Sequence, residues 1–178
     1  LVTSGLAFQQ VWRPGDWEVA VDPTLMAPAP LDPFRHAIEA TGYPFEVLTN
    51  PAAGNATPGH AALGPAADEA AFRERIRASL QAGRPVLALG LVGPADGALI
   101  TGYDEGGEVL IGWSFFQSFP EMNAGVAFEP TGECRVRGWY ASTPALLLLG
   151  EPGATPRRRD VLQSAYRRGV ALVRTPAL

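Results

Sequence analysis

Three short apolar runs, each rich in branched side chains, follow one another in the middle of the chain and constrain its fold most. They cover residues 85–91, 98–103 and 108–112. Runs of this length are typical of β-strands, and they fall far short of the ~20 apolar residues that a membrane span needs. The last two runs are joined by the Gly-containing segment 104–107, which predicts a hairpin loop. We therefore expect an antiparallel sheet at the centre of the fold.

Helices are predicted on both sides of these runs. The clearest covers residues 68–82, where Phe72 and Ile76 begin a stripe that recurs every four residues. A shorter helix is expected at 33–41 and an amphipathic, arginine-rich helix at 156–173. We read the cationic face of this last helix as solvated rather than phosphate-binding, because the whole chain is acidic.

Further strands are expected where apolar and polar residues alternate or where branched residues gather, at residues 17–22, 45–48, 125–128, 135–142 and 145–149. Residues 50–64 predict an exposed loop, since they are rich in Gly, Pro, Asn and Ala. A helical first half followed by mostly antiparallel strands favours the α+β class, with helices packed on the sheet. We divide the chain into a domain over residues 1–150 and a helix over 151–178 that begins a truncated helical extension.

The charge and residue types exclude several kinds of chemistry. Fourteen arginines and no lysine stand against eighteen acidic residues, for a net charge of −4, so we expect neither nucleic acid nor a membrane as partner. Without lysine the chain has no Schiff-base nucleophile. Cys134 is the only cysteine, which excludes an internal disulfide and a multi-thiolate metal site. We expect a cytoplasmic protein with no metal and no cofactor.

The candidates for acid–base or nucleophilic chemistry are few. His36 falls in the first predicted helix, where we expect a surface or half-buried residue, and His60 falls in the loop, where we expect an exposed one. Cys134 lies in a turn that leads into a strand, next to Arg135, which could lower the pKa of its thiol. We favour the interpretation that Cys134 is an ordinary strand-edge cysteine without a catalytic role.

An aromatic group follows the third apolar run directly and consists of Trp113, Phe115, Phe116 and Phe119. Aromatic walls with a few polar groups are typical of ligand pockets, and Ser114, Gln117 and Asn123 are available here. A hydrophobic core beneath a long loop is the alternative, and it is the more common use of such a group. Both interpretations stay open at this stage.

The three central runs, read as residues 83–89, 98–104 and 109–113, resemble the papain-like C39 peptidase-like superfamily. Within it they are most similar to the N-terminal domain of the butirosin biosynthesis acyltransferase family and to related uncharacterised bacterial proteins. Those families have a Gly-x-Pro-Val strand, a Gly-His strand that ends in Gly-Tyr-Asp, a hairpin, and a strand that ends in Asn or Asp. Residues 4–8 are similar to the start of the superfamily's nucleophile helix. The resemblance implies a papain-like fold.

The catalytic positions depart from the superfamily pattern. Ser4 stands where the resemblance places the nucleophilic cysteine, Ala98 where it places the base histidine, and Gly112 or Trp113 where it places the orienting Asn or Asp. An alanine takes no proton, and a serine without a base is a poor nucleophile. The resemblance therefore implies a catalytically degenerate domain with vestigial catalytic positions, and we lean against an enzyme.

We expect this domain to bind a peptide or small molecule in a cleft between its helical half and its sheet, lined by Asp96, Trp113 and Phe115. One alternative is an acyltransferase or amide hydrolase with an unorthodox nucleophile, Ser4 or Cys134, and His60 as base. Another is a structural or oligomerisation domain that uses the arginine-rich C-terminal helix, so a homo-oligomer stays open.

Overall fold

The computed structural model describes residues 31–174, which divide into two compact units. The sheet unit is Glu46–Leu149, and the terminal unit combines the chain up to Phe45 with the chain from Gly150 onward. Ser4 and the strand predicted at residues 17–22 lie outside the described residues. No helix in the described part is long and apolar enough to span a membrane.

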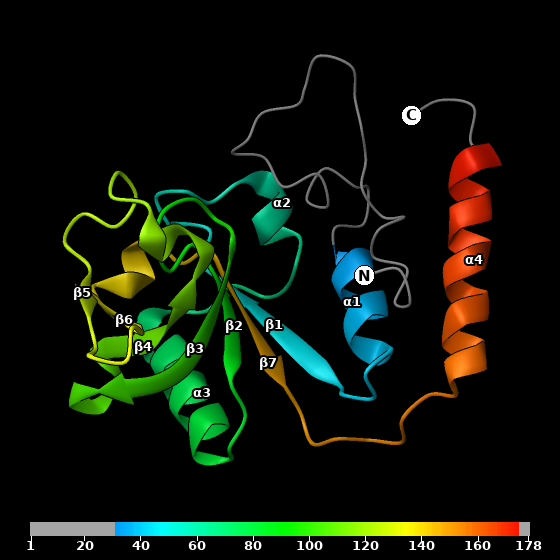
Figure 1. Ribbon diagram of the computed structural model, residues 1–178, viewed down its shortest axis with the longest axis horizontal. Coiled ribbons are helices and arrows are strands. Elements are labelled where there is room, and N and C mark those ends of the chain that lie inside the picture. The colour runs from blue at the N-terminus through cyan, green and yellow to red at the C-terminus, as the bar shows by residue number, and fades with distance from the viewer. Residues whose placement is uncertain (1–30, 175–178) are drawn as a thin grey trace. The chain divides into compact units, whose positions relative to one another are not determined.

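The sheet unit is built on a seven-stranded antiparallel sheet, in the order β1-β7-β2-β3-β4-β6-β5 (Figure 1). This confirms the α+β class and the antiparallel sheet expected from the three apolar runs. The strands are β1 (Phe45–Thr49), β2 (Val86–Leu89), β3 (Gly97–Asp104), β4 (Val109–Ser114), β5 (Ala127–Phe128), β6 (Cys134–Arg137) and β7 (Ala145–Leu149).

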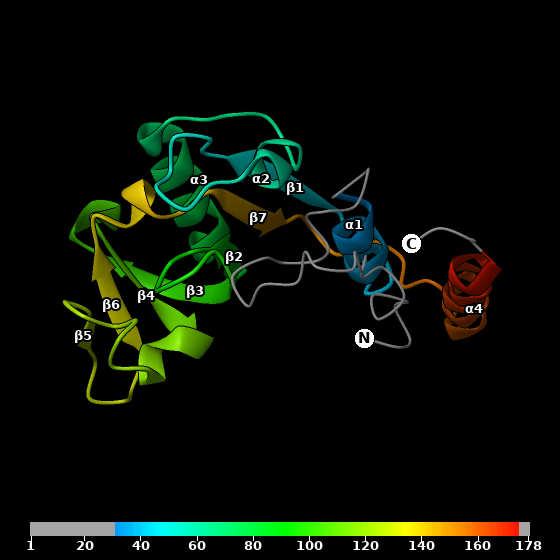
Figure 2. The ribbon, with the colours of Figure 1, turned by 90° about the horizontal axis from the view of Figure 1, so that it is seen from above.

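One helix covers one face of this sheet. Helix α3 (Glu69–Gln81) begins after Asp68, whose carboxylate oxygen Oδ1 accepts a hydrogen bond from the Ala71 N–H at 2.8 Å. It lies against β2, β3 and β7, as Figure 2 shows. Phe72 and Ile76 point into the core and are completely buried, as their four-residue spacing predicts. The short helix α2 (Pro58–Ala61) precedes α3 and lies in the predicted loop.

The strand register assigns the side chains to two faces. Val86 pairs with Ile100, and both belong to the core that also holds Phe72 and Ile76, so their face of the sheet is the core face. On the opposite face, which we call the far face, a row of apolar side chains runs across adjacent strands, because Leu147, Leu87, Leu99 and Trp113 pair in turn. Leu87 and Trp113 remain 40% and 44% exposed.

The strand predicted over residues 135–142 is wrong in its second half. β6 ends at Arg137, and Gly138 has a φ of +66°, a left-handed conformation that redirects the chain. The 3-10 helix η5 (Trp139–Ala141) follows. The Trp139 ring is buried there, and its Nε1–H donates to the carbonyl oxygen of Gly107 at 3.0 Å. That tertiary contact favours the turn over a longer strand.

The terminal unit contains α1 (Leu31–Glu39) and α4 (Arg158–Arg174) among its described residues. Both helices match their predicted positions within two residues. Gly42, with φ +87°, follows α1 and lies against the segment before α4: its carbonyl oxygen accepts from the Gly153 N–H at 2.9 Å, and a Cβ at Gly42 would lie 3.1 Å from the Thr155 Cα. Ala165 of α4 is buried.

Candidate functional site

The position that the resemblance assigns to the base lies at the paired ends of β3 and β4. Ala98 is 3% exposed and stands directly opposite Ser114, while Gly112 stands opposite Ile100, one pair along the same face. Trp113 pairs with Leu99 and therefore projects from the far face. The structure thus puts Ala98 and Gly112 on one face, and Trp113 on the other.

A β-bulge between Ile100 and Gly102 sets this register. Counting back from the hairpin without the bulge would place Ala98 opposite Phe115, whereas the extra residue places it opposite Ser114. Sequence reasoning missed Ser114 as the cross-strand neighbour of Ala98. Only the glycine at residue 102, in a strand otherwise free of glycine between its ends, hints at the irregularity.

Gly112 has a steric reason to be glycine. A Cβ at this position would lie 2.1 Å from the carbonyl oxygen of Leu99 on the neighbouring strand. No side chain fits at that separation without moving the backbone of β3. The closeness of the two strands therefore accounts for Gly112.

Asp96 lies in the loop between β2 and β3, one residue before β3 begins. Its carboxylate oxygen Oδ1 accepts from the Gly97 N–H at 2.6 Å, and its carbonyl oxygen accepts from the Gly90 N–H at 3.0 Å. Because Asp96 is outside the strand, strand alternation does not assign it to the face of Ala98. Its side chain is exposed, next to the first residue of β3.

An aromatic patch lies directly after the last residue of β4. We define the aromatic patch as Phe115, Phe119 and Met122, with Phe116 behind them. Phe115 is 66% exposed, Phe119 38% and Met122 39%. The Phe115 and Phe119 ring centroids are 5.2 Å apart, and Phe116, which packs on the core, lies 5.2 Å from Phe115. Phe116 thus packs on the core, as the core interpretation expects, whereas Phe115 and Phe119 are exposed and a ligand pocket at these rings stays a prediction.

The polar side chains of this segment hold the turn in shape. The Ser114 hydroxyl oxygen accepts from the Phe116 N–H at 3.2 Å, and the Gln117 Oε1 accepts from the Ser114 N–H at 2.9 Å. The Gln117 Nε2 donates to the carbonyl oxygen of Gly132, and the Asn123 Nδ2 to that of Gln117. These bonds cap the 3-10 helix η4 (Phe115–Ser118) and fix the rings that it carries.

The β2–β3 loop and the aromatic turn pack against each other. Gly93, with φ +71°, approaches the turn so closely that a Cβ there would lie 3.1 Å from the Phe116 Cβ and 3.3 Å from the Met122 Cβ. Asp96 belongs to the same tight loop. Asp96, Ala98, Ser114 and the aromatic patch therefore lie together at one end of the β3–β4 pair.

Cys134 is the first residue of β6, in agreement with the interpretation of an ordinary cysteine at a strand end, and it is fully buried. Its thiol donates to the carbonyl oxygen of Gly112 at 3.1 Å. Burial raises the pKa of the Cys134 thiol above its ordinary value. A cysteine nucleophile needs an accessible thiol with a lowered pKa, and this cysteine has neither property.

The two histidines differ in their surroundings. His36 is half-buried on α1, as expected. His60 is 1% exposed, so the prediction of an exposed loop residue is wrong. Its ring caps α2: the Thr57 N–H donates to the His60 Nδ1 at 2.9 Å, which leaves that nitrogen without a proton.

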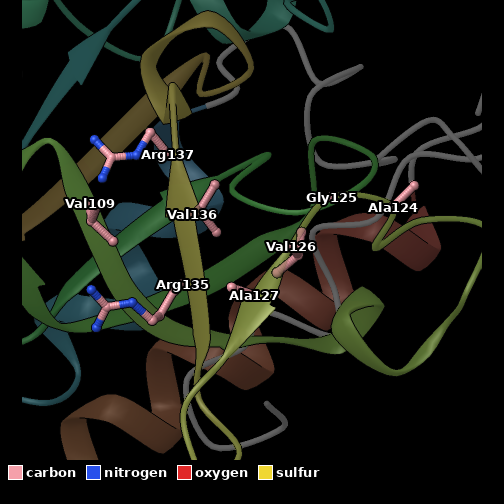
Figure 3. Close-up of a pocket in the computed structure, with 8 residues that line it drawn as sticks. All are labelled: Val109, Ala124, Gly125, Val126, Ala127, Arg135, Val136 and Arg137. Carbon is pink, nitrogen blue, oxygen red and sulfur yellow. The ribbon is translucent and has the colours of Figure 1, made fainter.

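A separate pocket of about 470 Å³ lies between Val109, β5 and β6. Figure 3 shows Arg135 and Arg137 projecting from the same side of β6, toward Val109. Carboxylates already bind both guanidinium groups, since Arg135 pairs with Asp104 and with Glu129, and Arg137 pairs with Glu105. The pocket holds none of the residues predicted for the site.

Within residues 31–174, no group of three or more His, Cys, Asp or Glu side chains is arranged to hold a metal ion. The chain matches no protein-family model, no curated protein and no solved structure.

Proposed function

We propose that the sheet unit is a catalytically degenerate papain-like domain that binds a peptide without cleaving it. One observation carries the proposal: Ala98, at the position of the superfamily's base, stands opposite Ser114 beside an exposed aromatic patch. An alanine in place of the base removes proton transfer, and the exposed rings beside it retain apolar surface for a ligand.

The ligand contacts in this proposal come from both sides of the strand ends. Asp96 supplies a carboxylate from the β2–β3 loop, and Phe115 supplies the most exposed ring of the aromatic patch. Trp113 adds apolar surface from the far face, where its indole is 44% exposed and lies against Gly132. A ligand that contacts all three wraps around the end of β4, which an extended peptide chain can do.

The alternative of an acyltransferase or amide hydrolase gains no support from the described candidates. The Cys134 thiol is buried with a raised pKa, and the His60 Nδ1 is engaged by the backbone of its own helix. Ser4, the remaining nucleophile of that alternative, lies outside the described residues.

A structural or oligomerisation function has one observation in its favour. Tyr166 and Val170 lie one turn apart on α4 and are 63% and 49% exposed. If this face joins two copies, sedimentation should give a dimer that the double substitution Tyr166→Ala, Val170→Ala converts to a monomer. A wild-type monomer at all concentrations would remove this function.

The peptide-binding function is tested by passing a random heptapeptide library over the immobilised full chain and identifying retained peptides by mass spectrometry. We expect intact peptides to be retained by the wild type and lost from Phe115→Ala. Phe128→Ala is the matched control, because Phe128 is a 45% exposed phenylalanine on β5. Retention of no peptide would contradict binding, and release of shortened peptides would instead support a hydrolase.

A further inference from the structure

The segment that forms the candidate site has an unusual charge distribution. Residues 85–134 contain seven carboxylates and no arginine, lysine or histidine. This segment includes β2, β3, β4 and the whole aromatic patch. Any positive charge near its carboxylates must therefore come from another part of the chain or from a ligand.

Arginines from other parts of the chain bind four of these seven carboxylates. The ion pairs are Arg73–Glu108, Arg135–Asp104, Arg135–Glu129 and Arg137–Glu105. A fifth carboxylate, that of Glu133, accepts from the Thr131 hydroxyl. Among the described residues, no ion pair reaches Asp96 or Glu121, and both are exposed.

Asp96 and Glu121 belong to the two segments that pack against each other at the aromatic patch. Asp96 is in the β2–β3 loop, whose Gly93 approaches both Phe116 and Met122. Glu121 precedes Met122 directly, and the Met122 N–H donates to the Phe119 carbonyl oxygen at 2.9 Å. The patch thus combines exposed rings with a carboxylate in each of the two loops that form it.

We propose that the aromatic patch docks a peptide segment in which arginine or lysine stands next to a large apolar side chain. This inference rests on the proposed peptide-binding function and names the class of peptide. The apolar side chain would cover Phe115 and Phe119, whose exposed surface has no partner in the sheet unit. The cation would lie over a ring face and near Asp96 or Glu121, where the ring quadrupole and the carboxylate attract it together.

Hydrogen bonds hold the turn in shape without a ligand. The bonds from Ser114 and Gln117 hold η4, and Gly132 accepts the second amide bond of Gln117. A ligand therefore need not order the loop, and the entropy cost of binding is correspondingly small. An acidic or neutral apolar peptide would fit the same rings but would lose the attraction of the two carboxylates.

The test uses three N-acetylated, C-amidated hexapeptides that share two phenylalanines and differ at two positions, which are arginine, glutamine or glutamate. Dissociation constants are measured by calorimetry with the full chain at low salt. We expect the arginine peptide to bind about fivefold more tightly than the glutamine peptide, and the glutamate peptide to bind most weakly. High salt should remove most of this preference.

The double variant Asp96→Asn, Glu121→Gln should bind the arginine and glutamine peptides within about twofold of each other, while its affinity for the glutamine peptide stays at the wild-type value. Asn at position 96 retains the oxygen that accepts from Gly97. Glu74→Gln on α3 is the matched control, since it removes an exposed carboxylate elsewhere and should preserve the preference.

The outcomes separate this inference from the function on which it rests. Equal binding of all three peptides, abolished by Phe115→Ala, would overturn the charge preference and leave peptide binding in place. Binding of the arginine peptide that Phe115→Ala leaves intact would overturn the assignment to the patch. If no peptide binds in either this test or the library experiment, both proposals fail.

Discussion

Two phenylalanines of the sheet unit, Phe72 and Phe115, differ strongly in their exposure to solvent. Phe72 on α3 is completely buried against the core face, and its ring contacts Tyr140 edge-on at 5.3 Å. Phe115 at the end of β4 is 66% exposed, although it too belongs to a cluster of rings. Phe72 lies in the helix α3 and Phe115 in the 3-10 helix η4, so a lack of regular backbone structure does not explain the difference.

The comparison shows that the aromatic patch is organised by polar bonds rather than by burial. Burying a phenylalanine side chain contributes about 1.5–3 kcal/mol, and the exposed rings forgo most of that contribution. Ser114 and Gln117 nevertheless hold the turn in one conformation. A fixed shape combined with exposed apolar surface is typical of a binding surface. Phe72, by contrast, contributes its ring to the core.

The largest effect is expected at the buried end of this comparison. Phe72→Ala should lower the free energy of unfolding by about 3–5 kcal/mol, because it leaves a cavity between α3 and the core face. Urea denaturation of the full chain measures this loss. A loss below about 1 kcal/mol would mean that α3 does not seal the core as described.

The next effect tests the strand closeness beside Ala98. Gly112→Ala should cost about 1–3 kcal/mol or more, since its Cβ would meet the Leu99 carbonyl oxygen at 2.1 Å. Gly97→Ala is the control, because nothing lies within 4 Å of a Cβ there. Equal stability of the two variants in the same denaturation experiment would contradict the β3–β4 register.

At the exposed end of the comparison, Phe115→Ala should change the free energy of unfolding by less than about 0.5 kcal/mol. The ring is largely solvated in the free protein and its loss opens no cavity. Thermal unfolding followed by circular dichroism checks this. A loss comparable to that of Phe72→Ala would show that Phe115 serves the core.

The smallest effect on stability is expected from the exposed ion pair between Arg73 and Glu108. The Arg73 side chain, by hydrogen bonding, lowers the pKa of the Glu108 carboxyl below its ordinary value of 4.5. A pKa that is lower in the folded state than in the unfolded state contributes stability above pH 4.5 that is lost as the pH falls through the folded pKa. Glu108→Gln should therefore lose less stability than the wild type on acidification below pH 4.5. Urea denaturation across this pH range measures the free energy of unfolding of the wild type, of Glu108→Gln and of the control Glu74→Gln. If the three profiles of stability against pH coincide, the Arg73–Glu108 pair does not contribute to stability.

Local patterns in the sequence predicted much of the fold. The four-residue spacing that begins at Phe72 and Ile76 located α3, and the apolar runs located β2, β3 and β4. These signals succeed because burial on one face repeats with the period of the element. They also placed the aromatic group at the end of β4, where the candidate site lies.

The misses arose where a tertiary contact decides the local structure. The bulge at Ile100 and Gly102 changes which residue faces Ala98, and no periodicity encodes it. The 3-10 helix η5 forms where the Trp139 Nε1–H donates to the carbonyl oxygen of Gly107, which is 32 residues away in the chain. Each of these depends on a partner that the local pattern does not name, so the details of the site could not be read from the sequence.

The central claim is that the end of the β3–β4 pair binds a peptide. The most direct test is to map the backbone amide signals of the isotopically labelled full chain by NMR while the arginine hexapeptide is added. The account predicts shifts confined to residues 90–98 and 113–123, which carry Asp96, Ala98 and the aromatic patch. Shifts centred on the pocket of Arg135 and Arg137, or no shifts at saturating peptide, would contradict it.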